Sequence, residues 1–150
     1  MKVLLAIDGS KSSECVFNEL KHIRLDKDSE VIILSAVEKA APIMGEPFGG
    51  ALYQYEAELE KQGITAAQDI VKDAKEKIEK EFGCYVKSEV MIGSPKYTIV
   101  EKSKEWSTDL IILGSHGYGL WERVLLGSVS TFVAQHAECS VLISRCQHKE

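Results

Sequence analysis

Short apolar runs alternate along this chain with longer segments of helical periodicity. Each run is nearly continuous in Val, Ile and Leu, which is typical of a strand buried on both faces of a parallel sheet. Strands that alternate with helices favour a single-domain, three-layer α/β sandwich with right-handed crossovers. The sequence therefore predicts one parallel sheet whose strands fall at residues 3–7, 31–37, 86–92, 108–113 and 141–143.

The segments between these runs carry apolar residues three or four positions apart, as amphipathic helices do. The longest such segment extends from about residue 56 to 81, and Gly83 is the residue expected to terminate the helix. Residues 40–53 are rich in proline and glycine instead, so an irregular loop is expected there. The predicted starts of the shorter helices are a cap at Ser10 or Ser12, a cap at Ser94 followed by Pro95, and a cap at Ser128.

The length of 150 residues suits one domain with a substantial core. We expect residues 1–146 to form this domain and residues 147–150 to be a short polar tail. The net charge of −5 argues against nucleic-acid binding. No apolar run is long enough for a membrane span, so no membrane partner is expected.

Two further features predict a cytoplasmic location. The first residues reach a charged position too early for a secretory signal. The four cysteines form no C-x-x-C pair, and we expect buried, reduced thiols. They are Cys15, Cys84, Cys139 and Cys146.

Three glycines and a serine follow the fourth apolar run at fixed spacing. Gly114, Gly117, Gly127 and Ser128 form the pattern Gly-x2-Gly-x9-Gly-Ser between a strand and a helix. Glycine permits positive φ and lets an anion approach the main chain. Consecutive N–H groups and a helix N-terminus supply positive potential. Nucleotide phosphates are therefore expected on residues 114–119 and against residues 128–130, although a tight turn with a helix cap is the alternative.

This pattern resembles the nucleotide-binding signature of the universal stress protein family, and the resemblance extends over nearly the whole chain. It implies a Rossmann-like sheet of strand order 3-2-1-4-5 that binds ATP. It also implies that Asp8 contacts the ribose or the adenine and that Ala6 and Ala36 line the adenine pocket. A residue of an Asx turn is the alternative role for Asp8. The residues expected to bind nucleotide are Ala6, Asp8, Ala36, Gly114, Ser115, His116, Gly117, Tyr118, Gly119, Leu120, Gly127, Ser128, Val129 and Ser130.

In the order 3-2-1-4-5, the direction in which successive strands are added to the sheet reverses between the first and fourth strands. Ligands of open α/β sheets bind beyond the carboxyl ends of the strands at such a reversal. Asp8 and Gly114 follow these two strands, so both lines of reasoning point to one place. The fifth strand is then an apolar edge with no charge inside it, which predicts a homodimer through residues 141–144, as the resemblance also implies.

The chain has no Gly-Lys-Ser/Thr motif, so no side chain is evidently placed to stabilise charge on a γ-phosphate. Together with this absence, the resemblance implies a dimeric stress-response sensor or regulator that binds ATP with Mg²⁺, the metal being held by phosphates and water. Its protein partner is unknown. A slow ATPase and a nucleotide-independent interaction module are the alternatives.

Overall fold

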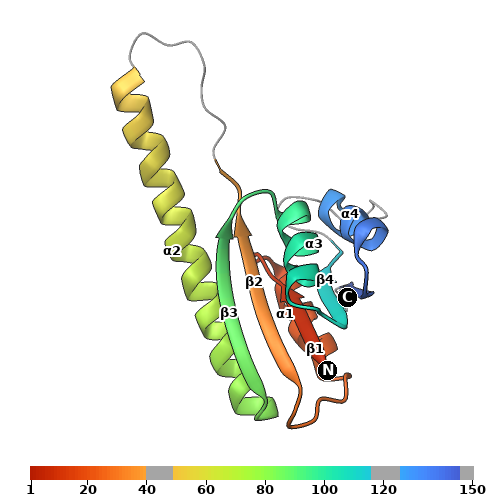
Figure 1. The fold of residues 1–150 in the computed structure, drawn as a ribbon. Coiled ribbons are helices and arrows are strands. Elements are labelled where there is room, and N and C mark those ends of the chain that lie inside the picture. Colours follow the sequence, from red (N-terminus) through yellow and green to blue (C-terminus); the bar gives the residue numbers. More distant parts are fainter. Residues whose placement is uncertain (40–48, 116–125, 146–150) are drawn as a thin grey trace, which may run out of the picture.

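A three-layer α/β sandwich is formed by residues 1–39, 49–115 and 126–145, which the computed structural model describes (Figure 1). The middle layer is an all-parallel sheet of five strands in the order β3-β2-β1-β4-β5. This class and this strand order are the expected ones. The strands are β1 (Lys2–Ala6), β2 (Glu30–Val37), β3 (Tyr85–Ile92), β4 (Leu110–Gly114) and β5 (Ser140–Ser144).

The order of strands reverses at β1, which has β2 on one side and β4 on the other. Ala6 pairs with Leu34 on β2 and with Leu113 on β4, and it is the last residue of β1 in either ladder. The next N–H, that of Ile7, still donates to the Leu34 carbonyl at 3.0 Å. Asp8 is therefore the first residue beyond the sheet at the reversal.

Two helices cover each face of the sheet. Val3 and Leu5 of β1 pack in one core cluster with α1 (Lys11–Leu20) and α2 (Gly49–Phe82). Leu4, which points the other way, belongs to a second cluster with α3 (Pro95–Glu105) and α4 (Ser128–His136). This alternation follows from the two-residue period of a strand.

The long helix α2 extends beyond the carboxyl ends of the strands (Figure 1). Tyr53 and Tyr55 on this projecting part are 70% and 63% exposed. Residues 49–53 are helical, so the expectation of an irregular segment through residue 53 is wrong for them, while residues 40–48 lie outside the described part. The two glycines at its start lower helix propensity, but the residues after them contain no proline that would block a helix.

The helix caps differ from the expected ones in one case. Ser10 and Ser94 are the N-caps of α1 and α3, although neither side chain makes a capping hydrogen bond. Gly127, and not Ser128, is the N-cap of α4. The expected cap at Ser128 is therefore one residue too late, because a glycine occupies the capping position without any side chain.

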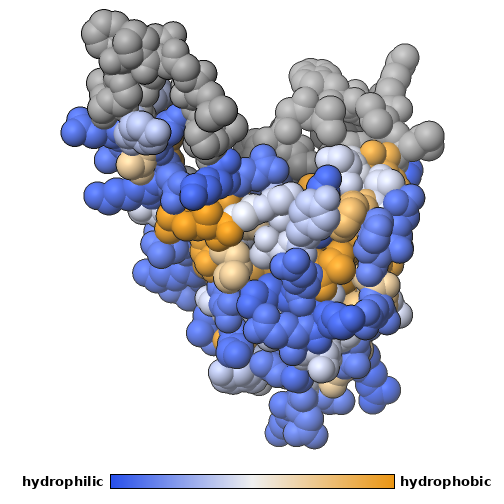
Figure 2. All heavy atoms as spheres, turned by 45° about the horizontal axis from the view of Figure 1, so that its top comes forward, coloured by the Kyte–Doolittle hydropathy of each residue, from blue (hydrophilic) through white to orange (hydrophobic). Residues whose placement is uncertain are grey.

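The face of the molecule drawn in Figure 2 is largely hydrophilic, with hydrophobic side chains in separate patches. No helix formed by the described residues is long and apolar enough to span a membrane.

Cys84 and Cys139 have free thiols, and burial raises the pKa of each. Cys15 is disulfide-bonded, so the expectation of reduced thiols is wrong there, since spacing in sequence does not reveal proximity in space.

Candidate functional site

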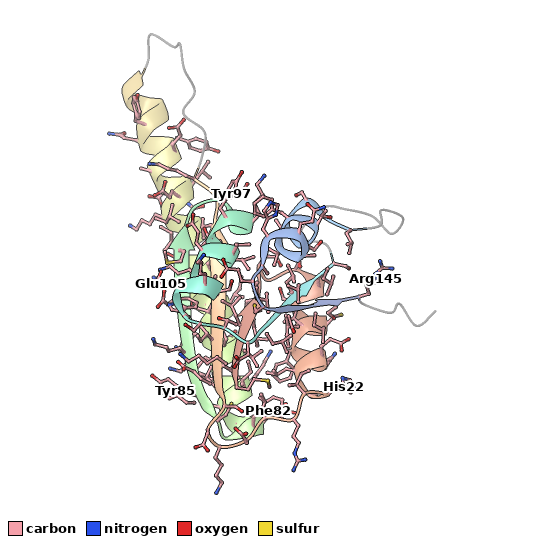
Figure 3. All side chains as sticks on the ribbon, turned by 45° about the vertical axis from the view of Figure 1, so that its right-hand side comes forward. His22, Phe82, Tyr85, Tyr97, Glu105 and Arg145 are labelled. Carbon is pink, nitrogen blue, oxygen red and sulfur yellow. The ribbon has the colours of Figure 1, made fainter. Side chains whose placement is uncertain are left out.

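A small cavity lies where the strand order reverses, at the carboxyl ends of β1, β2 and β4. Its volume is about 120 Å³. The first turns of α1, α3 and α4 approach it, at the same end of the molecule as Tyr97 in Figure 3 and opposite to Phe82. Leu34, Ile99 and Leu113 form its apolar wall. Small-molecule pockets usually measure about 300–1,000 Å³, so this cavity can enclose only part of a nucleotide.

The structure brings five of the expected site residues into the lining of this cavity. They are Ala6, Asp8, Ala36, Gly114 and Val129, which come from three strands, the loop after β1 and one helix. Ser115, Gly127, Ser128 and Ser130 lie beside it, where β4 ends and α4 begins. His116, Gly117, Tyr118, Gly119 and Leu120 fall outside the described residues.

Hydrogen bonds join the two ends of the glycine motif. The Gly127 N–H donates to the Ser115 carbonyl at 2.8 Å, and the Ser115 N–H donates to Ser144 on β5 at 2.8 Å. The buried Ser130 hydroxyl lies 3.1 Å from the Ser115 carbonyl and 3.0 Å from that of Gly127. This hydroxyl is engaged within the protein, which leaves the backbone N–H of Ser130 as the group that an anion can use.

The start of α4 supplies positive potential beside the cavity. Thr131 is the first residue whose N–H donates within the helix, to the Gly127 carbonyl at 3.0 Å. The N–H groups of residues 128–130 precede that bond and carry the partial positive charge of the helix terminus. Gly127 has φ −68° and ψ 162°, which any residue can adopt. The expectation that this position needs a glycine for positive φ is therefore wrong. The space left by the missing side chain is the remaining reason for a glycine there.

Hydrogen bonds join Asp8, in the loop after β1, to Ser13 in the first turn of α1. The Ser10 N–H donates to Asp8 Oδ1 at 2.9 Å, so the Asx turn considered for Asp8 is present. Gly9 takes φ +78°, which favours glycine. The N–H groups of Asp8 and Gly9 both donate to Ser13 Oγ at 3.1 Å, and Ser13 Oγ donates to Asp8 Oδ1 at 3.1 Å.

Sequence reasoning missed two polar residues of the cavity, Ser12 and Ser13. The sequence suggests Ser12 only as a helix cap. The signal that could have found Ser13 is its place in the first turn of the helix, five residues after Asp8, from which a hydroxyl can reach back to the preceding loop. Among the described residues, no group of three or more His, Cys, Asp or Glu side chains is placed to hold a metal ion.

Comparisons with known proteins agree with this architecture. The universal stress protein MJ0531 of Methanocaldococcus jannaschii is 32% identical over 149 residues, which cover 99% of this chain and 84% of that protein. The solved structure of protein MJ0577 matches with a TM-score of 0.85 at 26% identity and covers 99% of this chain and 97% of its own.

A more distant structure shows the same fold. It is a universal stress protein family protein from Arabidopsis thaliana with AMP bound, which matches with a TM-score of 0.66 at 19% identity over 99% of this chain and 93% of its own. The model of the universal stress protein family matches residues 1–145. The chain therefore belongs to the universal stress protein family.

Proposed function

We propose that this protein is a cytoplasmic stress-response sensor or regulator that binds an adenine nucleotide, ATP with Mg²⁺, and that works as a homodimer. The observation that carries the nucleotide part is the cavity at the strand reversal. It combines the small side chains of Ala6 and Ala36 with Asp8, Gly114 and the N-terminal turn of α4. A flat apolar ring, a polyol and an anionic group would each meet suitable chemistry there.

The parts of the nucleotide are assigned by chemistry. The adenine lies against the apolar wall of Leu34 and Ile99, where small side chains leave room for a ring. The phosphates lie toward residues 128–130, because these N–H groups stabilise negative charge. Asp8 must be kept away from the phosphates, since like charges repel, and it accepts a hydrogen bond from a hydroxyl or amino group. Mg²⁺ would neutralise phosphate charge, with phosphate oxygens and water as its ligands.

The AMP in the Arabidopsis thaliana protein supports this assignment only in a general way. At 19% identity the likeness concerns the fold, so the proposal rests on the residues of this chain.

The direct test is to denature the purified protein and identify the small molecule that it releases. Release of ATP supports the proposal, release of ADP with measurable turnover favours a slow ATPase, and absence of nucleotide favours an interaction module. Calorimetry with ATP should then compare Ala36→Leu, which fills the cavity, with Ala66→Leu on the exposed face of α2. The first variant should lose binding and the second should keep it. Equal affinities would contradict the proposed location.

Hydrolysis should be slow or absent, because the described residues that line the cavity include no lysine to stabilise charge on a γ-phosphate. Turnover at or above roughly 1 per second, which is ordinary for committed enzymes, would favour the ATPase alternative. Loss of that turnover in Asp8→Asn would then identify a chemical role for Asp8.

The homodimer is proposed to form through β5. This strand pairs with β4 on one side and is an edge of the sheet among the described strands. Val141, Leu142 and Ile143 are only partly buried, and no charge or proline within the strand protects the edge. Pairing with β5 of a second copy would satisfy both edges around a two-fold axis.

The dimer is tested by light scattering on wild type and Ile143→Lys, with circular dichroism as the folding check. Lys87→Ala on the opposite edge strand β3 is the matched control, and it should leave the dimer intact. A monomeric wild type, or a folded Ile143→Lys variant that dimerises as before, would refute this interface.

A further inference from the structure

The Ser13 hydroxyl has no hydrogen-bonding capacity left for a ligand. A serine hydroxyl offers one donor and two acceptor positions. Ser13 Oγ accepts from the N–H groups of Asp8 and Gly9 and donates its proton to Asp8 Oδ1, each at 3.1 Å. Ser13 nevertheless lines the cavity. Its contribution to ligand binding must therefore pass through the groups that it holds.

Asp8 is held through only one of its two carboxylate oxygens. Oδ1 accepts from the Ser10 N–H at 2.9 Å and from the Ser13 hydroxyl at 3.1 Å. No described residue donates to Oδ2, and Asp8 itself lines the cavity and is exposed. A carboxylate fixed through one oxygen has lost rotational freedom, so its second oxygen is a preorganised acceptor for a donor on the ligand.

We propose that Ser13 is a positioning residue that fixes Asp8 for a ribose hydroxyl and thereby makes the site selective for nucleotides with an intact 2′,3′-diol. This inference rests on the proposed function and adds the class of nucleotide that the site accepts. A ribose fits this acceptor because the sugar lies between the base and the phosphates. The apolar wall of Leu34 and Ile99 takes the base, and the N-terminus of α4 takes the phosphates.

The energetic size of such a contact sets the expected selectivity. Hydrogen bonds to charged groups are worth more than neutral ones, and an unpaired charged partner is penalised. Wild type should therefore bind ATP about ten-fold or more tightly than 2′-deoxyATP or 3′-deoxyATP, whichever lacks the hydroxyl that contacts Asp8.

The experiment is calorimetry of ATP, 2′-deoxyATP and 3′-deoxyATP with wild type, Ser13→Ala, Ser13→Thr and Ser88→Ala. Ser13→Ala should bind ATP about ten-fold more weakly and lose most of its selectivity against the deoxynucleotide. Ser13→Thr keeps a hydroxyl and should restore both. Ser88 is the matched control, because it lies on the edge strand β3 and neither lines the cavity nor takes part in these hydrogen bonds.

A double-mutant cycle with Asp8→Ala separates positioning from a merely structural role. If Ser13 acts through Asp8, then Ser13→Ala should change ATP affinity less than two-fold in the Asp8→Ala background. Thermal unfolding of each variant checks the fold, and Ser13→Thr provides the answer if the alanine variant is unstable.

The outcomes distinguish the inference from the function beneath it. A wild type that binds no adenine nucleotide overturns both. A wild type that binds both deoxynucleotides as tightly as ATP overturns the role of Ser13 but leaves nucleotide binding standing. A Ser13→Ala variant that keeps the ribose selectivity of wild type does the same. If Ser13→Ala loses selectivity against ITP, which lacks the adenine amino group, but keeps the ribose selectivity of wild type, then Asp8 contacts the base. That result would also overturn the inference.

Discussion

Each face of the sheet carries a hollow, and the larger hollow is the less suitable site for a ligand. The cavity on the α3 and α4 face has about 120 Å³, whereas the groove between α1 and α2 on the other face has about 560 Å³. Leu5 and Ile33 line the groove and are only 2% and 0% exposed, so neighbouring side chains cover them from solvent. Toward the far end of the helices, the Phe17 and Phe82 rings pack edge to face with their centroids 6.4 Å apart.

The polar groups of the two hollows also differ. Glu14, Asp73 and Lys77 of the groove are exposed charges on the surfaces of the two helices, where water solvates them. Ser10 and Ser13 also line the groove, but the Asp8 carboxylate that they fix by hydrogen bonds lines the cavity and not the groove. Convergent, preorganised polar groups at the strand reversal therefore mark a site better than volume does, while the groove face mainly stabilises the fold.

The first test of this division is Leu20→Ala on α1. Leu20 is fully buried in the core cluster of the groove face, so we expect the free energy of unfolding to fall by about 2–5 kcal/mol. Nucleotide affinity, measured by calorimetry well below the unfolding temperature, should stay within two-fold of wild type. A parallel loss of affinity would mean that the two faces are coupled.

Gly127→Val examines the other face. Valine accepts φ −68° and ψ 162°, but Gly127 is buried and is the N-cap of α4, so the free energy of unfolding should fall by about 1–3 kcal/mol. The added side chain occupies space at the N-terminus of α4, and nucleotide affinity should fall about 100-fold, or about 2.7 kcal/mol. Chemical denaturation and calorimetry check both numbers. Unchanged affinity would contradict the phosphate assignment.

The smallest expected effect concerns the groove itself. Ala74→Leu on α2 places extra methyl groups in this space and should raise the free energy of unfolding by up to about 1 kcal/mol. Ala66→Leu on the exposed face of the same helix is the matched control and should change it by less than about 0.5 kcal/mol. A drop in ATP affinity for Ala74→Leu would show that the groove belongs to the site.

Much of the fold was predictable because strand and helix periods are local properties. The strand at residues 31–37 differs from β2 by one residue, since its apolar run alone defines it. The start of α2 was not predictable, because glycine and proline indicate a loop but do not show where the helix after them begins. The disulfide of Cys15 could not be predicted either, since it depends on contacts in space.

The candidate site was predictable where it follows strand ends. Asp8 and Gly114 were placed by their position after apolar runs, and they do line one cavity. Ser13 was missed, because its role depends on the turn conformation that Gly9 permits and not on any period in the sequence. The capping position of Gly127 was missed for a related reason, since glycine has no side chain to signal a cap.

The early end of the β1 ladder has an evolutionary consequence. Ala6 is the last paired residue of this strand, and Asp8 and Ser13 come after the sheet is complete. Replacing either residue removes hydrogen bonds of one turn but none between strands. Descendants of such a chain can therefore explore new ligands by single substitutions without first rebuilding their architecture, and selection on recognition can proceed apart from selection on folding.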